Sequence, residues 1–95
     1  MEKLTVFYLE GCPYCRNARK AFAELAAETP EYGETDVEWI EESRHPDIVK
    51  GRQYYYVPTI YEGETTLYEA RPGEPYAECK ANVKAALDAV HQSRN

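Results

Sequence analysis

The sequence is poor in the residue types that mark several classes of protein. The 95-residue chain has three cysteines, two histidines and one methionine, and no hydrophobic run is long enough to span a bilayer. Three cysteines are an odd number and too few for a disulfide framework. Lys and Arg number 11 against 17 Asp and Glu, so the net charge is −6. Because phosphate binding needs clustered cations, neither nucleic acid nor a membrane surface is an expected partner.

The remaining composition is that of a small globular domain. Hydrophobic residues make up 43% and charged residues 29% of the chain, which argues against disorder. The length suits one domain covering residues 1–95. The first residues, MEKLTVFYLEG, lack a small-residue cleavage site and are rich in β-formers, so they predict a strand and not a signal peptide. With one CxxC pair, one isolated cysteine and no export signal, we expect a cytoplasmic protein, and a monomer.

Hydrophobic patterning predicts that strands and helices alternate. β-branched and aromatic residues mark the strands, and apolar residues three and four positions apart mark the helices. The predicted strands are 3–9, 36–41, 54–61 and 66–70, and the predicted helices are 12–29, 46–51 and 75–91. The order β-α-β-α-β-β-α corresponds to an α/β fold, in which helices cover both faces of a four-stranded mixed sheet.

The stretch EGCPYC places two thiols, Cys12 and Cys15, three positions apart. Such a pair can bind a metal, form a structural disulfide or carry out redox chemistry. A structural zinc site needs four ligands, and the other candidates, Cys79 and the two histidines, are scattered along the sequence. We therefore predict no metal site. The position of the pair between a predicted strand and a predicted helix favours redox chemistry.

The predicted helix gives the two cysteines different roles. Cys12 falls at the helix cap, where unpaired N–H groups and the helix dipole favour a negatively charged thiolate. Cys15 lies one turn further along, where it can attack a mixed disulfide formed on Cys12. Arg16 and Arg19 add positive potential nearby, and Glu10 opposes it.

Two motifs resemble the glutaredoxin branch of the thioredoxin-like superfamily. They are Cys12-Pro13-Tyr14-Cys15 and Val57-Pro58-Thr59, and the order of the predicted elements agrees over essentially the whole chain. The resemblance implies a thioredoxin-like fold and a thiol–disulfide oxidoreductase, with Cys12 as the nucleophile and Cys15 as the resolving thiol. It implies no bound cofactor, glutathione as a co-substrate, and protein disulfides or glutathione mixed disulfides as partners.

The resemblance also implies which residues contact the substrate. A cis Val57–Pro58 bond would place Pro58 beside the sulfurs and offer the backbone of Val57 to an incoming peptide or glutathione. Pro13 and Tyr14 would contact the substrate at the helix start. Gly73 would supply a backbone N–H to a glutathione carboxylate.

This sequence departs from the glutaredoxin pattern at the glutathione contacts. Leu9 stands where these proteins usually carry a Lys, and Arg71-Pro72-Gly73-Glu74-Pro75 stands where they usually carry a Gly-Gly pair. Proline donates no N–H, so the physiological reductant stays open between glutathione and a reductase. The residues that could replace the Lys are Arg52, Gln53 and Arg71.

Three other features have competing interpretations. The segment 28–43 is acidic and has no Lys or Arg, so it is either a solvated face or a partner site. If this segment is a partner site, the chain would be a thioredoxin-like binding or redox-sensing module with little turnover. We expect Cys79 to pack in the core and not to be a regulatory thiol. The run Tyr54-Tyr55-Tyr56 is expected to pack as part of a strand.

Overall fold

The elements follow the predicted order, with two short 3-10 helices added. The computed structural model describes residues 3–52 and 54–92. Its elements are β1 (Lys3–Tyr8), α1 (Pro13–Glu28), η1 (Pro30–Glu34), β2 (Asp36–Glu41), η2 (Glu42–Arg44), α2 (Pro46–Val49), β3 (Thr59–Glu62), β4 (Thr65–Glu69) and α3 (Tyr76–Gln92).

The four strands form one mixed sheet in the order β2-β1-β3-β4. β1 pairs with β2 in parallel, with Val6 opposite Trp39. β3 is antiparallel to both β1 and β4, and the register of β3 against β4 shifts between Ile60 and Tyr61. The predicted four-stranded mixed sheet is therefore confirmed.

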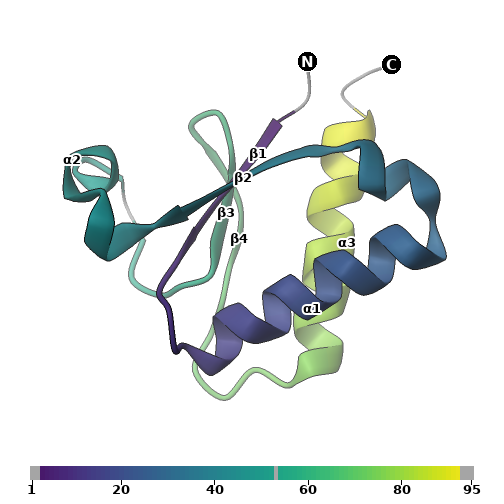
Figure 1. The fold of residues 1–95 in the computed structure, drawn as a ribbon, viewed down its shortest axis with the longest axis horizontal. Coiled ribbons are helices and arrows are strands. Elements are labelled where there is room, and N and C mark those ends of the chain that lie inside the picture. Colours follow the sequence, from purple (N-terminus) through teal and green to yellow (C-terminus); the bar gives the residue numbers. More distant parts are fainter. Residues whose placement is uncertain (1–2, 53, 93–95) are drawn as a thin grey trace.

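Helices α1 and α3 cover one face of the sheet (Figure 1). Pro13 begins α1, where a missing N–H costs nothing, and the helix ends at Glu28, just before Pro30. Even-numbered residues of β1 point toward the two helices because side chains alternate along a strand. The core on this face includes Leu4, Val6 and Ile60 of the sheet, Ala18, Ala21 and Leu25 of α1, and Val83, Leu87 and Val90 of α3.

The opposite face of the sheet has a smaller core and a much shorter helix. Phe7, Ile40 and Tyr61 form this second cluster, and Val49 of α2 packs against it. Figure 1 shows α2 on the side of the sheet away from α1 and α3. The predicted helix 46–51 is shorter than expected, because the chain leaves it at Lys50 and then turns through Gly51, whose φ is +92°.

The predicted strand 54–61 is wrong in its first half, because β3 begins only at Thr59. Pro58 cannot donate to a strand ladder. The Glu69 carboxylate accepts the N–H groups of Tyr55 and Tyr56 at 2.7 and 2.8 Å. These bonds fold the segment into a loop in which Tyr55 is 93% exposed and Tyr56 is 50% exposed. The expected strand packing is therefore wrong for these two tyrosines.

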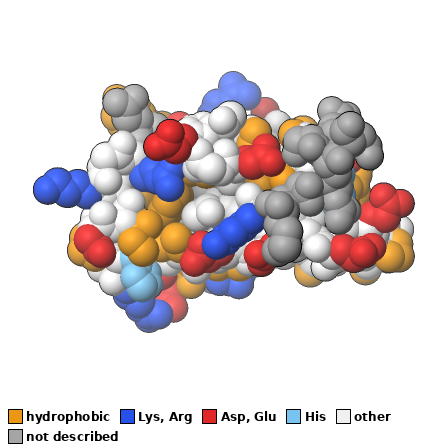
Figure 2. Space-filling view, turned by 90° about the horizontal axis from the view of Figure 1, so that it is seen from above, with side chains coloured by type: hydrophobic (Ala, Val, Ile, Leu, Met, Phe, Trp, Pro, Cys, Tyr) orange, Lys and Arg blue, Asp and Glu red, His pale blue; other side chains and the backbone are white. Residues whose placement is uncertain are grey.

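The surface carries charges of both signs. Figure 2 shows acidic and basic side chains scattered over the upper face, with hydrophobic side chains gathered at the end where α2 lies. Within residues 3–52 and 54–92, none of the helices has both the length and the apolar character needed to cross a membrane.

Candidate active site

Cys12 lies at the junction between β1 and α1. It is the N-cap residue of α1 and is half-buried. Gly11 precedes it with φ +81°, a conformation that favours glycine and turns the chain into the helix. The Cys12 thiol donates to the carbonyl oxygen of Val57, with Sγ and O 3.9 Å apart. The Val57–Pro58 bond is cis, so the structure brings the two predicted motifs into contact across 45 residues.

Cys15 lies one turn into α1, and its side chain is buried. The residue is 3% exposed. Burial raises the pKa of the Cys15 thiol to about 12, and the Cys12 thiol and the Glu42 charge act in the same direction, while a contact to the backbone of Leu9 opposes them. All three cysteines are free thiols. The pair therefore consists of a partly accessible thiol and a buried, protonated one.

A small hollow opens beside the two cysteines. It measures about 200 Å³ and is lined by Tyr8, Leu9, Glu10, Gly11, Cys12, Cys15, Arg16 and Arg19. The Arg19 guanidinium lies over the rings of Tyr8 and Trp39, 4.8 and 4.3 Å from their centroids. The Glu10 carboxylate pairs with Arg44 at 3.2 Å. The hollow is thus lined by both cysteines of the motif and by two arginines.

Glu41 holds the chain that leads into the site, and it was not among the site residues predicted from the sequence. It ends β2 and is only 7% exposed. Its carboxylate accepts the Ser43 hydroxyl at 2.5 Å, the Ser43 N–H at 2.7 Å and the Glu10 N–H at 3.1 Å. The Ser43 hydroxyl and the Glu10 N–H lower the pKa of Glu41. The only available sequence signal was its place directly after Ile40, at the end of a predicted strand.

Tyr14 connects the motif to the loop before α3. Its hydroxyl accepts the N–H of Gly73, with the two atoms 2.7 Å apart. Gly73 has φ +80°, and the start of α1 and this loop lie at the same end of the molecule (Figure 1). The buried Glu74 anchors the loop by accepting from the Tyr68 hydroxyl and, at 3.2 Å, from the amide of Asn82. The N–H that the resemblance assigns to glutathione is thus bonded within the chain.

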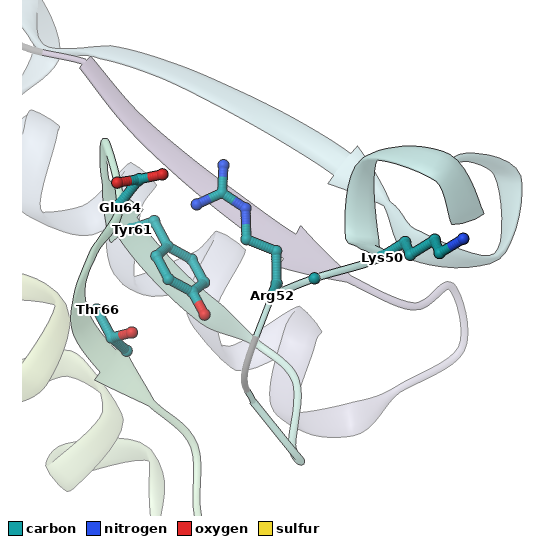
Figure 3. A pocket seen from close by; sticks show the side chains of 6 residues that line it. Lys50, Arg52, Tyr61, Glu64 and Thr66 are labelled. Atoms are coloured by element: carbon teal, nitrogen blue, oxygen red, sulfur yellow. The ribbon is translucent and has the colours of Figure 1, made fainter.

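The residues considered as replacements for the missing Lys lie elsewhere. Arg71 pairs with Glu78 at 3.6 Å, and Gln53 lies outside the described residues. Arg52 lies over the Tyr61 ring, 4.8 Å from its centroid, and donates to the carbonyl of Gly63 at 3.1 Å. It lines a second cavity of about 540 Å³, between the segment after α2 and the β3–β4 hairpin (Figure 3). Neither arginine lines the hollow beside Cys12.

Two further expectations concern metal ligands and Cys79. Across the two described ranges, no group of three or more His, Cys, Asp or Glu side chains is placed to hold a metal ion. Cys79 is 2% exposed and belongs to the core between the sheet and the two long helices. Burial raises the pKa of its thiol. Its predicted packing in the core is confirmed.

Comparison with known proteins identifies the fold. No protein-family model matches the sequence, and no curated protein matches it significantly. Among solved structures, human ERp44 is similar with a TM-score of 0.59 and 19% identity over 99% of this chain, which spans 28% of the length of that protein. Thioredoxin 1 from Thermosipho africanus is similar with a TM-score of 0.57 and 16% identity over 94% of this chain and 98% of its own. The chain therefore has the thioredoxin-like fold.

Proposed function

We propose that the chain is a glutaredoxin-like thiol–disulfide oxidoreductase that reduces protein disulfides or glutathione mixed disulfides. One observation carries the proposal. Cys12 is the N-cap residue of α1 and its thiol donates to the carbonyl of Val57, while Cys15 lies buried one turn further along the helix. The pair supplies an accessible nucleophile and a sheltered second thiol, which is what disulfide exchange requires.

The reaction proceeds in two exchanges. The Cys12 thiolate attacks one sulfur of the substrate, the substrate S–S bond breaks, and the other sulfur leaves as a thiolate that takes up a proton. Cys15 then loses its proton and attacks the Cys12 sulfur, releasing the second substrate thiolate. The substrate gains two electrons, and Cys12 and Cys15 become a disulfide. A thiol reductant, either glutathione or the dithiol of a reductase, returns the pair to its reduced form.

The backbone around Val57 supports a docking site for an extended substrate. The Val57 carbonyl faces Cys12, and among the described residues its N–H has no hydrogen-bond partner. An extended chain pairs with such groups by strand addition. Pro13 is exposed and Tyr14 half-buried at the neighbouring helix start, so both can contact the substrate. We propose that the protein works as a monomer in a reducing compartment such as the cytoplasm.

Reduction of two model disulfides tests the proposal. Wild type, Cys12→Ser and Cys15→Ser are assayed with insulin and with a hydroxyethyl disulfide, each with glutathione or with a dithiol as reductant. We expect Cys12→Ser to lose activity on both substrates, because it lacks the nucleophile. Cys15→Ser should keep only the monothiol reaction of the hydroxyethyl disulfide. Cys79→Ser serves as the matched control, since this thiol lies in the core and does not line the hollow beside Cys12.

The assay separates the proposal from its alternatives. Full activity of Cys12→Ser would refute the mechanism. If wild type turns over neither substrate with either reductant, a binding or redox-sensing module is the better description. Activity with the dithiol but not with glutathione would show that glutathione is not the reductant of this protein.

A further inference from the structure

We propose that the hollow beside Cys12 selects disulfides in polypeptide segments that carry a carboxylate next to the reacting cysteine. Arg16 and Arg19 are the residues that determine this specificity. The inference rests on the proposed function and names its preferred substrate class. It starts from the lining of the hollow, to which Arg16 and Arg19 contribute together with Cys12 and Cys15.

The two arginines have no acidic partner, unlike several other basic residues of the chain. Lys3, Arg71 and Lys80 pair with carboxylates of the chain. Neither Arg16 nor Arg19 forms an ion pair or a hydrogen bond through its side chain with another residue of the described ranges. Their N–H donors are therefore available to an acceptor supplied by a ligand.

Arg19 is also held in place before any ligand arrives. Its guanidinium lies over the rings of Tyr8 and Trp39, and those rings pack edge-to-face with their centroids 5.9 Å apart. A guanidinium that rests on aromatic rings keeps its donors in a planar fork that matches a carboxylate. Because the side chain is already ordered, less conformational freedom is lost on binding.

Charge and size of the hollow favour an acidic peptide. The one acidic residue in the lining, Glu10, is paired with Arg44 at 3.2 Å, which offsets its repulsion of an anion. The hollow of about 200 Å³ is smaller than the several hundred Å³ of a typical small-molecule site. It fits one side chain of a longer segment, whose disulfide then lies against Cys12.

The expected effect is modest, because the contacts are made near the surface. An exposed ion pair changes an equilibrium by about 1.4- to fivefold, so two such pairs together should raise kcat/KM by roughly fourfold. Salt at about 0.5 M should remove most of this preference, because it screens charges that lie more than a few ångströms apart.

Three matched peptides test the inference. Each carries the same disulfide, flanked by Glu, by Gln or by Lys, and kcat/KM is measured for wild type and for the double variant Arg16→Gln/Arg19→Gln. We expect wild type to prefer the Glu peptide to the Gln peptide by about fourfold. The double variant should lose this preference and still turn over the Gln peptide. Lys20→Gln is the matched control, since Lys20 lies on the same helix but over the Tyr76 ring.

The outcomes distinguish this inference from the proposed function. Equal kcat/KM for the three peptides in wild type would overturn the inference and leave the proposed function intact. Failure to turn over any of them would overturn both. Dithiodipropionic acid and its diamide form a second pair of probes. The ratio of kcat/KM for the free acid to that for its diamide is compared with the ratio for the Glu and Gln peptides. If the two ratios are equal and both are lost in the double variant, the assignment to a polypeptide substrate is wrong.

Discussion

Cys15 is expected to react slowly with an alkylating reagent while the chain is folded. Its pKa of about 12 lies three units above the ordinary value of 9.0, so near neutral pH about a thousandfold less of it is thiolate. A more basic thiolate is also more nucleophilic. With a Brønsted coefficient of about 0.4 to 0.5, the rate constant of the Cys15 thiolate is roughly 15- to 30-fold higher than that of an ordinary thiolate. The net result is a rate about 30- to 60-fold lower than that of an ordinary thiol, before any steric effect of burial.

The measurement uses a variant in which Cys15 is the only thiol. Cys12→Ser combined with Cys79→Ala leaves Cys15 alone, and Ser keeps a small polar group at the helix cap. The Cys12 thiol is one cause of the raised pKa, but burial is the largest and remains in this variant. The rate of iodoacetamide alkylation is followed at about pH 7 to 10.5 in buffer, and in urea as the unfolded reference. A urea titration confirms that the variant is folded in buffer.

The pH profiles decide the outcome. In buffer, the logarithm of the rate should rise by about one for each pH unit up to the highest pH. In urea, the rate should level off near pH 9, where an ordinary thiol is half ionised. A plateau near pH 9 in buffer, or equal rates in buffer and in urea at neutral pH, would refute the reasoning from burial.

Three further predictions concern the stability of the site and the core. Tyr14→Phe should lower the free energy of unfolding by about 0.5–1.5 kcal/mol, because it removes the hydroxyl that accepts the Gly73 N–H at 2.7 Å. Hydrogen exchange of the Gly73 amide should become faster, and unchanged exchange would contradict the contact. The pKa of Glu41 is lowered from 4.5 by the Ser43 hydroxyl and the Glu10 N–H, so its carboxylate stabilises the fold above about pH 4.5 and this stabilisation is lost as the pH falls. Glu41→Gln should therefore lower the urea midpoint near pH 6 and flatten its decline toward about pH 3; a parallel decline in both proteins would argue against this role. Leu87→Ala should cost about 2–5 kcal/mol in a urea titration, since Leu87 is 1% exposed, whereas the exposed Ala81→Ser should change the value by less than about 0.5 kcal/mol.

Local signals in the sequence predicted the first half of the fold well. Gly11 and Pro13 fix where β1 gives way to α1, and Pro30 fixes the end of that helix, so each boundary depends on residues close to it. The Cys12–Val57 contact joins residues far apart in sequence. The resemblance to glutaredoxins implied only that Pro58 lies beside the sulfurs. Composition and periodicity alone do not contain this contact.

Two of the differences from the sequence-based predictions have the same physical cause, a hydrogen-bond partner distant in the sequence. The tyrosine run has high β-propensity, but the carboxylate of Glu69 takes the N–H groups that a neighbouring strand would need. Glu41 lies in an acidic run that reads as a solvated face, yet it is buried because the N–H of Glu10 reaches it from 31 residues away. Partners of this kind depend on the assembled fold.

The acidic strand β2 also affects how the protein behaves when it is crowded. β2 and β4 are the outer strands of the sheet, and outer strands can pair with another copy through their unused N–H and C=O groups. Asp36 and Glu38 are exposed on β2, while the register shift between Ile60 and Tyr61 makes the pairing beside β4 irregular. Two copies that approach through β2 bring like charges together. Because Glu38 is paired with Lys3 at 2.9 Å, we expect Asp36 to contribute most of this repulsion, which disfavours edge-to-edge pairing through β2.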